Sequence, residues 1–373
     1  MRMEAHMLAS EIIGGYTCYF DCQEGAEALL IQAIDQYDLE GLEQQIAQTR
    51  ALTGRAFSII AFHVTRWNDA LSPWPAPPVF GKEGFAGKAR ETLDFMENAL
   101  LPWARERFSA ARLYLGGYSL SGLFALWAAC QTDAFEGVAA CSPSVWFPGW
   151  IEYAQAHPPK AASVYLSLGD REEKTRNQTM ARVGDCIRQQ HALLQNALDC
   201  TLEWNPGNHF MDAPLRVAKG FAWLLNRPRI RLVTDSKRQY MDLLLLGDEQ
   251  EDMIDRYLEH GDLYVLDDQG VKALCVVMPA GDALEIKNIA VRPACQRRGF
   301  GRLLINHVAR QYAGRFSVLR AGTGDSPLTV PFYEACGFSR AGVIPDFFTR
   351  NYDHPIVEGG VRLRDMIVLE RRM

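Results

Sequence analysis

A serine, a histidine and a group of carboxylates occur along the chain in settings that suit nucleophilic catalysis. Ser119 stands at a corner where an apolar run, 113–115, gives way at once to a helical pattern. His209 lies in a Pro-Gly-Asn loop, where core packing explains a histidine poorly. The turn between them carries Asp170, Glu172 and Glu173. A hydroxyl, an imidazole and a carboxylate can perform acyl transfer, because the imidazole takes the hydroxyl proton and the carboxylate orients the imidazole.

The segment 117–122 reads GYSLSG and has the layout of a nucleophile elbow. A strand, an abrupt turn and a helix raise the serine hydroxyl beside a helix N-terminus, whose free N–H groups favour a developing oxyanion. The usual pattern is G-x-S-x-G, but Ser121 replaces the second glycine, which is displaced to Gly122. Ser121 is small enough to let strand and helix approach. A simple strand–helix turn built from small residues is the alternative interpretation of the motif alone.

The elements around this corner alternate between strand and helix patterns over residues 10–226. We expect strands at 10–21, 57–64, 113–115, 135–144, 163–173 and 200–210. Helices are expected at 24–51 (split near Gly41), 91–108, after Ser119, at 179–198 and at 214–226. The alternation predicts a parallel sheet covered on both faces, with catalytic groups at the carboxyl ends of the strands. The loop 65–87, with four prolines and two tryptophans, is either a pocket wall or an apolar plug.

Three stretches, GGYSLSGLFALWA, SLGDREE and WNPGNHF, resemble the α/β-hydrolase family. Within it they are similar to small capless serine esterases of the enterobactin-esterase-like and putative-esterase kind, over roughly residues 10–226. The resemblance implies acyl transfer to Ser119, with His209 as base and then acid. It favours Glu172 as the acid, since this residue lies three positions after the glycine that ends the strand. The other two candidates for the acid, in order, are Asp170 and Glu173.

The same resemblance implies an oxyanion hole with two donors. One is the backbone N–H of Leu120. The other comes from the loop after the 57–64 strand, near residues 65–68, without a particular residue being indicated.

A second stretch that could do chemistry is 296–302, QRRGFGR, at the head of a helical pattern. Glycines at a helix N-terminus let backbone N–H groups point at a pyrophosphate, and arginines add positive charge. A tight strand–helix turn is the plainer interpretation. Before it we expect a strand at 230–236, short helices at 238–247 and 249–261, a hairpin over 262–282 and a strand over 283–293.

The Q-x-x-G-x-G pattern after this strand, together with FYEACGF at 332–338, resembles the GNAT N-acetyltransferase family over about residues 230–373. The resemblance implies an α+β domain with a mixed sheet and acetyl-CoA as cosubstrate. The residues implied to hold the cofactor are Ile289, Ala290, Val291, Gln296, Arg297, Arg298, Gly299, Phe300, Gly301 and Arg302. Backbone groups of Ile289 and Val291 would contact the pantetheine arm, and residues 297–302 would cradle the pyrophosphate.

The same resemblance implies that Tyr333 is the general acid that protonates the leaving thiolate; a core aromatic is the alternative. Glu285, on the strand facing the amine, is a candidate base acting directly or through water; a solvated carboxylate is equally compatible with the sequence. The segment 345–369 is expected to close the acceptor pocket. Three acidic residues in it would suit a cationic amine: Asp346, Asp353 and Glu358.

Composition places a domain boundary near 226–229. Residues 1–228 hold 19 Lys and Arg against 25 Asp and Glu, whereas residues 229–373 hold 20 against 20, so the net charge of −6 lies in the first part. All eight tryptophans also precede residue 228. The acidic balance argues against nucleic-acid binding by the first part. No apolar run approaches membrane-spanning length, and nine scattered cysteines indicate reduced thiols.

The sequence therefore predicts an α/β-hydrolase domain, with a mostly parallel sheet between helices, at 1–228 and a GNAT domain at 229–373. We expect a cytoplasmic, bifunctional enzyme that hydrolyses a small ester or thioester and acetylates a small amine, with no metal, nucleic-acid or membrane partner. The alternative is a catalytically silent hydrolase fold that binds a small molecule or partner for an active acetyltransferase.

Overall fold

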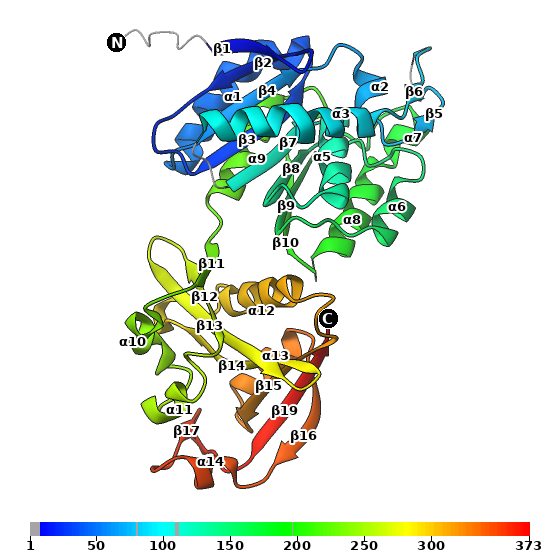
Figure 1. Ribbon diagram of the computed structural model, residues 1–373. Coiled ribbons are helices and arrows are strands. Elements are labelled where there is room, and N and C mark those ends of the chain that lie inside the picture. The colour runs from blue at the N-terminus through cyan, green and yellow to red at the C-terminus, as the bar shows by residue number, and fades with distance from the viewer. Residues whose placement is uncertain (1–7, 80, 109–111, 196) are drawn as a thin grey trace. The chain divides into compact units, whose positions relative to one another are not determined.

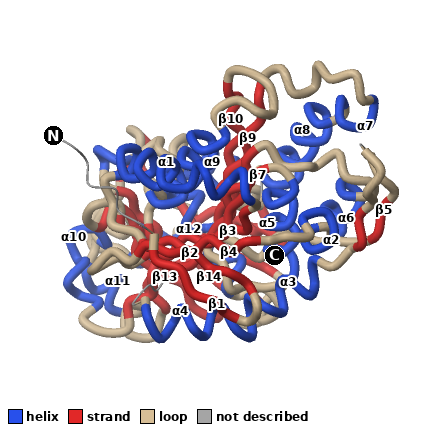
Figure 2. The backbone as a smooth tube through the Cα atoms, turned by 90° about the horizontal axis from the view of Figure 1, so that it is seen from above, coloured by secondary structure: helices blue, strands red, loops and turns tan. Residues whose placement is uncertain are grey.

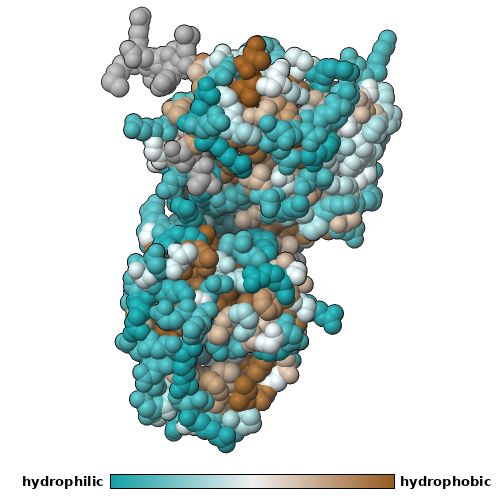
Figure 3. Space-filling model, in the orientation of Figure 1, coloured by the Kyte–Doolittle hydropathy of each residue, from teal (hydrophilic) through white to brown (hydrophobic). Residues whose placement is uncertain are grey.

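The computed structural model describes residues 8–79, 81–108, 112–195 and 197–373. The chain divides into two units, Met1–Arg227 and Pro228–Met373. Each unit has its own sheet and its own hydrophobic core (Figure 1). On the face shown in Figure 3, hydrophilic residues cover most of each unit. Within the described ranges, no helix is both long enough and apolar enough to cross a membrane.

The first unit is built on an eight-stranded sheet. In pairing order its strands are β1 (Ala9–Ile13), β2 (Tyr16–Asp21), β4 (Ser58–His63), β3 (Ala28–Ile34), β7 (Arg112–Tyr118), β8 (Gly137–Cys141), β9 (Ser163–Gly169) and β10 (Asp199–Asn205). The pairs β1–β2 and β2–β4 are antiparallel, and every later neighbour in this order pairs in parallel. The predicted mostly parallel sheet is confirmed.

Helices cover both faces of this sheet. They are α1 (Gln36–Thr53), α2 (Trp67–Leu71), α3 (Ala89–Phe95), the π-helix η1 (Met96–Leu100), α4 (Leu101–Arg107), α5 (Leu120–Gln131), α6 (Trp150–Ala156), α7 (Gln178–Ala181), α8 (Val183–Leu194) and α9 (Ala213–Leu225). Helices α1 and α9 lie side by side and share one apolar core with the sheet (Figure 2). Helices α3, α4, α5, α6 and α8 contribute to the other core.

Strand β3 corrects the prediction of a helix over 24–51. Every residue of this strand is buried, between β4 and β7. A short run that is buried on both faces shows no alternation, so periodicity cannot distinguish it from a buried helix. Helix α1 begins only at Gln36, where the side chain of Asp35 accepts a hydrogen bond from the N–H of Asp38 at 2.8 Å.

Two further expectations for this unit are wrong. Helix α1 does not divide at Gly41. This glycine instead lets α9 pack closely, since a Cβ there would lie 2.8 Å from the ring of Pro214 on α9. The expected strand over 10–21 is a hairpin of β1 and β2, which turns at Gly14 and Gly15 with positive φ angles. The loop 65–87 also contains regular structure, namely α2 and the short pair β5 (Pro75–Ala76) and β6 (Phe85–Ala86).

The register of the parallel strands determines what meets at their carboxyl edge. Tyr118, the last residue of β7, is opposite Cys141 at the end of β8, and Gly169 at the end of β9 is opposite Asn205 at the end of β10. The turns that follow these strands therefore leave the sheet beside one another. They carry Ser119, the acidic turn and the histidine loop.

The second unit is built on a seven-stranded mixed sheet. Its strands pair in the order β11 (Arg229–Val233), β12 (Asp262–Asp267), β13 (Val271–Ala280), β14 (Ala283–Val291), β15 (Val318–Gly324), β19 (Met366–Arg372) and β16 (Ser339–Ile344). Only β14 and β15 pair in parallel. A separate two-stranded pair is formed by β17 (Val357–Glu358) and β18 (Val361–Arg362). The predicted mixed sheet is confirmed.

The helices of this unit contribute to separate apolar clusters. They are the 3-10 helices η2 (Lys237–Tyr240) and η3 (Pro293–Cys295), and α10 (Met241–Leu244), α11 (Glu251–Asp255), α12 (Phe300–Gln311), α13 (Thr329–Ala335) and α14 (Phe347–Asn351). Helices α12 and α13 bury their apolar sides in one core cluster with the sheet. Helices α10 and α11 belong to a second cluster.

Candidate active sites

Ser119 occupies a strained backbone position between β7 and α5. Its φ of 56° and ψ of −119° are rarely adopted by a residue with a side chain, and such strain persists only where neighbours enforce it. Here the N–H of Ser119 donates to the carbonyl of Cys141 at 3.0 Å, and its carbonyl accepts from the N–H of Ser144 at 3.0 Å. The strain turns the hydroxyl away from the sheet, as a nucleophile elbow does.

The small residues of the elbow have separate structural reasons. A Cβ on Gly117 would lie 2.1 Å from Oγ of Ser121, so only glycine fits there. Ser121 itself is buried, and its hydroxyl donates to the carbonyl of Ala33 at 2.9 Å, at the end of the neighbouring β3. The departure from the usual pattern therefore has a packing role and leaves the backbone of the elbow intact.

Ser119, His209 and Glu172 form a continuous hydrogen-bonded chain. Nε2 of His209 lies 3.0 Å from Oγ of Ser119, and Nδ1 lies 2.7 Å from Oε2 of Glu172. The carboxylate is almost fully buried, while the histidine and the serine are partly exposed. These distances are those of a nucleophile, a base and an orienting acid.

The second carboxylate oxygen of Glu172 is saturated with donors. Oε1 accepts from the Gly169 N–H at 2.7 Å, from Oγ of Ser142 at 2.7 Å and from Nη1 of Arg216 at 2.8 Å. Burial by itself would raise the pKa of Glu172, but hydrogen bonds from His209, Ser142 and the Gly169 amide hold the pKa below its ordinary value of 4.5. The acid is therefore ionised near neutral pH, with Oε2 left for the imidazole.

The two other candidate acids face different partners. Oδ1 of Asp170 accepts the N–H of Gly207 at 2.8 Å, so this carboxylate holds the histidine loop. Glu173 forms an ion pair with Arg188 at 3.2 Å, and both side chains are partly exposed to solvent. Neither carboxylate contacts the imidazole of His209 among the hydrogen bonds of the described residues.

Arg216 and Tyr118 belong to this site, although the motifs did not indicate them. Arg216 is 1% exposed and its guanidinium contacts the acid, while the hydroxyl of Tyr118 donates to the carbonyl of His209 at 2.7 Å. A signal was present in the sequence: Arg216 lies on the apolar side of a helix, between Ala213 and Val217. A charge at such a position requires a buried partner.

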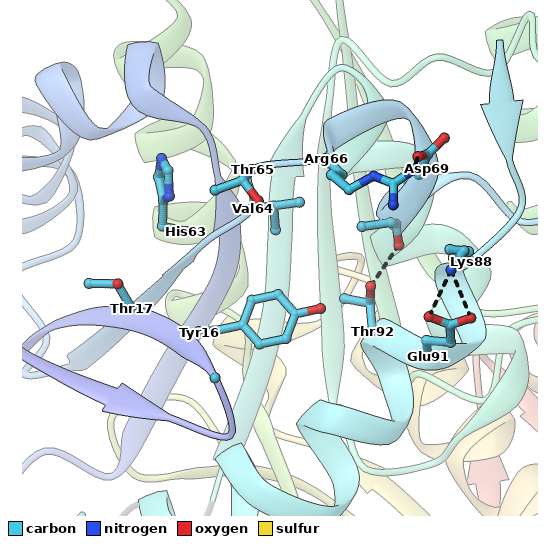
Figure 4. A pocket seen from close by; sticks show the side chains of 12 residues that line it. Tyr16, Thr17, His63, Val64, Thr65, Arg66, Asp69, Lys88, Glu91 and Thr92 are labelled. Atoms are coloured by element: carbon cyan, nitrogen blue, oxygen red, sulfur yellow. Dashed lines mark hydrogen bonds and ion pairs between the residues drawn. The ribbon is translucent and has the colours of Figure 1, made fainter. Parts of the chain in front are cut away.

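The predicted oxyanion donors lie in two places. Leu120 is the first residue of α5, where the backbone N–H groups of a helix have no partner within the helix. The loop near 65–68 borders a pocket of about 310 Å³, whose wall includes Thr65 and Arg66 (Figure 4). In this view Arg66 points toward Asp69, with which it forms an ion pair. Of the described residues that line this pocket, none is Ser119, Glu172 or His209.

In the second unit, a separation of two parallel strands opens a large cavity. β14 pairs with β15 only from Ala283 to Ile286, although it continues to Val291. A bulge at Lys287 interrupts its pairing with β13 at the same point. Beyond this point the backbone of β14 has no ladder partner in β15 among the described residues. The cavity beside it has a volume of about 1390 Å³.

Nine of the ten residues predicted to hold the cofactor line this cavity, and Arg298 is the exception. The nine are Ile289, Ala290, Val291, Gln296, Arg297, Gly299, Phe300, Gly301 and Arg302. Arg298 instead pairs with Asp268 at 3.2 Å and lies over the ring of Phe300. The loop before α12 has positive φ angles at Arg297 and Gly299, which turn successive backbone groups into a concave surface at the helix N-terminus.

Tyr333 and Glu285 also line the cavity, in different electrostatic settings. Burial raises the pKa of Tyr333 far above its ordinary value, so its hydroxyl keeps its proton at all working pH values. Oε1 of Glu285 is paired with Nζ of Lys287 at 2.9 Å. The phenol thus stays protonated, whereas the carboxylate is paired with a lysine.

The segment 345–369 contributes to the cavity wall, but not through all of its acidic residues. Of the three acids named for it, Glu358 lines the cavity, whereas Asp346 and Asp353 do not. Asp346 pairs with Arg350 and Arg364. Residues of this segment that do line the cavity include Phe347, Phe348, Tyr352, Ile356 and Leu363.

Asp248 is a further carboxylate of the cavity that the motifs did not indicate. The hydroxyls of Tyr352 and Tyr257 donate to its two oxygens at 2.9 and 3.3 Å. Burial raises its pKa above the ordinary value, and these two hydrogen bonds oppose the shift. Across the described residues of both units, no group of three or more His, Cys, Asp or Glu is arranged to hold a metal ion.

Comparisons with known proteins agree with this division. The family model described as "Putative esterase" matches residues 27–201, and the family model described as "Acetyltransferase (GNAT) domain" matches residues 259–340. The uncharacterized N-acetyltransferase YvbK of Bacillus subtilis is 34% identical over 151 residues, which are 39% of this chain and 96% of that protein. The chain therefore carries an esterase-family domain and, C-terminal to it, a domain by which it belongs to the GNAT acetyltransferase family.

Each unit is similar to proteins of known structure, and one example is given for each. An IroE-like serine hydrolase from Shewanella oneidensis is 18% identical and has a TM-score of 0.50, with 63% of this chain and 85% of that one covered. At this identity the likeness concerns the fold alone. A GNAT family acetyltransferase from Elizabethkingia anophelis, solved with acetyl-CoA bound, is 32% identical, with 40% of this chain and 99% of that one covered and a TM-score of 0.38.

Proposed function

We propose that the first unit is a serine hydrolase that cleaves a small ester or thioester. The observation that carries this proposal is the chain of hydrogen bonds from Glu172 through His209 to the hydroxyl of Ser119. His209 takes the hydroxyl proton as Oγ attacks the substrate carbonyl, and returns it to the leaving alcohol or thiol. Water then attacks the acyl-enzyme in the same way, which releases the acid and restores Ser119.

Two features support charge stabilisation in this reaction. The oxyanion forms beside the N-terminus of α5, where the N–H of Leu120 is the first donor, and a residue of the loop 65–68 supplies the second. The buried, ionised Glu172 stabilises the imidazolium that forms on His209. Ester hydrolysis requires no other group in the chain to change its charge.

Labelling with a fluorophosphonate probe tests this proposal directly. The full-length protein is expected to react stoichiometrically at Ser119 and to hydrolyse p-nitrophenyl acetate. Folded wild-type protein that neither reacts with the probe nor hydrolyses the ester would contradict the proposal and favour a silent binding module.

For the second unit we propose acetyl-CoA-dependent N-acetylation of a small amine. The observation that carries it is the parted end of β14 beside the loop 296–302, because free backbone groups of a strand and a helix N-terminus suit the pantetheine and the pyrophosphate. Acetyl-CoA supplies the acetyl group. The role of proton donor to the departing thiolate goes to Tyr333, which stays protonated and lines the cavity.

The residues that line the cavity favour a cationic amine with an apolar body as the acetyl acceptor. Carboxylates at Asp248, Glu285 and Glu358 supply negative charge, and the aromatic rings of Phe348 and Tyr352 supply a surface for the body of the molecule. The amine attacks the acetyl carbonyl as the free base, so one carboxylate takes the proton that the ammonium form loses. Glu285 acts directly or through water, and Asp248 is placed to bind the ammonium form.

Isothermal titration of the full-length protein with acetyl-CoA, followed by an amine panel, tests this second proposal. We expect binding of acetyl-CoA and faster release of CoA with aryl-alkyl amines than with amino acids, whose carboxylates Asp248 and Glu358 would repel. A protein that does not bind acetyl-CoA would contradict the acetyltransferase proposal itself. A preference for anionic acceptors would contradict only the assignment of the amine class.

A further inference from the structure

A single buried guanidinium contacts the elements that carry all three residues of the proposed triad. Arg216 projects from α9, and its Nη1 lies 2.8 Å from Oε1 of Glu172. The same nitrogen lies 3.1 Å from the hydroxyl of Tyr118, the residue immediately before Ser119, and 3.1 Å from Oγ of Ser142. One prong of the guanidinium therefore joins the elbow to the acid.

The other prong of the guanidinium holds the histidine loop. Nη2 donates to the carbonyls of Pro206 and Asn208 at 3.0 and 2.9 Å. The carbonyl of His209 is held in turn by the hydroxyl of Tyr118, which itself accepts from Arg216. The backbone that leads into the base is thus fixed at three carbonyls, each connected to the same guanidinium.

We propose that Arg216 is a positioning residue of the hydrolase, and that its two-pronged contact sets the register of acid, base and nucleophile. This inference rests on the proposed serine hydrolase function. Because Oε1 of Glu172 is occupied by Arg216, Ser142 and the Gly169 amide, Oε2 is left to bind the imidazole.

All of the hydrogen bonds described for the Arg216 guanidinium are made by its two terminal nitrogens. Its Nε is buried and has no hydrogen-bond partner among the described residues, whereas each terminal nitrogen has at least two. A planar fork can bind a carboxylate and two carbonyls at once, and a lysine ammonium cannot reproduce that geometry from one point. The role therefore requires arginine specifically and not merely a buried positive charge.

Lys219 provides a matched control on the same helix. It lies three residues after Arg216, and its ammonium pairs with Glu203 at 2.6 Å and with the side chain of Asn205 at 2.8 Å. It is also a cation that joins α9 to the last strand of the sheet, but it makes no hydrogen bond to Ser119, Glu172 or His209 in the described structure. This ion pair is partly exposed, and its removal tests loss of a charge pair on the same helix without loss of the fork.

The experiment measures ester hydrolysis and tryptophan-monitored melting for the full-length protein and its variants. The variants are Arg216→Lys, Arg216→Met, Lys219→Met, Glu172→Gln and Glu172→Gln/Arg216→Met. We expect Arg216→Lys to fold and to lose about 100-fold in kcat with KM changed by less than about threefold, because misplacing a catalytic group by 1 Å costs about this much. Lys219→Met should keep wild-type kcat.

The double variant separates positioning from general support of the fold. If Arg216 acts largely through Glu172, replacing it in the Glu172→Gln background should cost at least about tenfold less than in the wild type, since coupled residues are not additive. Removing both charges should also raise the melting temperature above that of Arg216→Met, whose buried carboxylate has lost its cation.

Three results would overturn the inference. The first is a wild-type kcat in folded Arg216→Lys. The second is a loss of kcat in Lys219→Met equal to that in Arg216→Lys. The third is a double variant whose loss of kcat is the product of the losses in Arg216→Met and Glu172→Gln. In each of these cases wild-type hydrolysis still depends on Ser119, so the hydrolase proposal stands. A folded wild type without Ser119-dependent hydrolysis would overturn both proposals together.

Discussion

Oε2 of Glu172 lies 2.7 Å from Nδ1 of His209, although Asp170 precedes Glu172 by only two residues on the same turn. The turn decides between them. The N–H of Asp170 continues the pairing with β10 by donating to the carbonyl of Asn205 at 2.8 Å, and its side chain is directed to the N–H of Gly207. The N–H of Glu172 closes the turn on the carbonyl of Gly169 at 3.1 Å, which brings its longer side chain back under the imidazole.

We therefore predict that Glu172→Gln lowers kcat for ester hydrolysis by about 10⁴-fold, since an amide cannot hold the imidazole in the required tautomer. Asp170→Asn should cost far less, because it weakens one hydrogen bond to the histidine loop. Glu173→Gln, on the partly exposed side of the turn, should be indistinguishable from wild type. Steady-state kinetics on the three folded variants test this order. The assignment of Glu172 as the acid is wrong if Asp170→Asn has the lowest kcat.

Ser119→Ala should reduce hydrolysis by at least about 10³-fold and abolish labelling by the fluorophosphonate probe, because the nucleophile is lost. Ser121→Ala is the matched control, two residues away. It should keep most activity while losing about 1–3 kcal/mol of stability, the cost of leaving the buried carbonyl of Ala33 without its partner. Equal loss of labelling in the two variants would point to a damaged elbow and not to a lost nucleophile.

The contribution of Glu172 to stability should depend on pH in a defined direction. Its pKa in the folded state lies below the ordinary value of 4.5, so the ionised form stabilises the fold above that pH. This contribution is lost as the pH falls through the folded-state pKa. Urea unfolding followed by tryptophan fluorescence reports on the first unit alone, since all eight tryptophans precede residue 228.

In that measurement, the free energy of unfolding of wild type should exceed that of Glu172→Gln by more at pH 6 than at pH 3.5. A difference that stays constant between the two pH values would show that the acid is not held ionised by its partners. The reason for the expected convergence is that a protonated glutamate offers Arg216 and His209 no more charge than glutamine does.

Gly299 and Gly314 offer a controlled test of the cofactor loop. Their φ angles are 83° and 82°, an added Cβ would meet no atom within 4 Å at either, and they flank opposite ends of α12. Replacement by alanine should therefore cost a similar strain, about 1 kcal/mol, at each position. Only Gly299→Ala should weaken acetyl-CoA binding in titration calorimetry, by about tenfold, because its Cβ enters the proposed pyrophosphate site. Equal affinities would place the pyrophosphate elsewhere.

Tyr333→Phe should lower kcat for acetyl transfer by about 10²-fold while leaving acetyl-CoA affinity nearly unchanged, because the phenol donates its proton only as the thiolate departs. Tyr264→Phe is a suitable control, since this tyrosine lies in the same core cluster and does not line the cavity in the described structure. An unchanged rate in Tyr333→Phe would make the residue a core aromatic, as the alternative interpretation holds.

The features that the sequence predicted well are those made within a few neighbouring residues. The strand, turn and helix around Ser119 and the glycine loop before α12 are local patterns, in which residue preferences and turn chemistry agree with the fold. The alternation of strands and helices was likewise sufficient to predict the first sheet, whereas the mixed sheet of the second unit was expected from the resemblance to the GNAT family. Strand β3 was missed because a run that is buried on both faces leaves no periodic trace in the sequence.

What only the tertiary structure decided concerns residues that are distant in the chain. The selection of Glu172 over Asp170 depends on the register of β9 with β10, and the role of Arg216 depends on α9 packing beneath both of them. Such contacts arise from the way separate elements pack, and no spacing along the chain records them. The sequence by itself determined the types of chemistry, while the fold determined which side chains face one another.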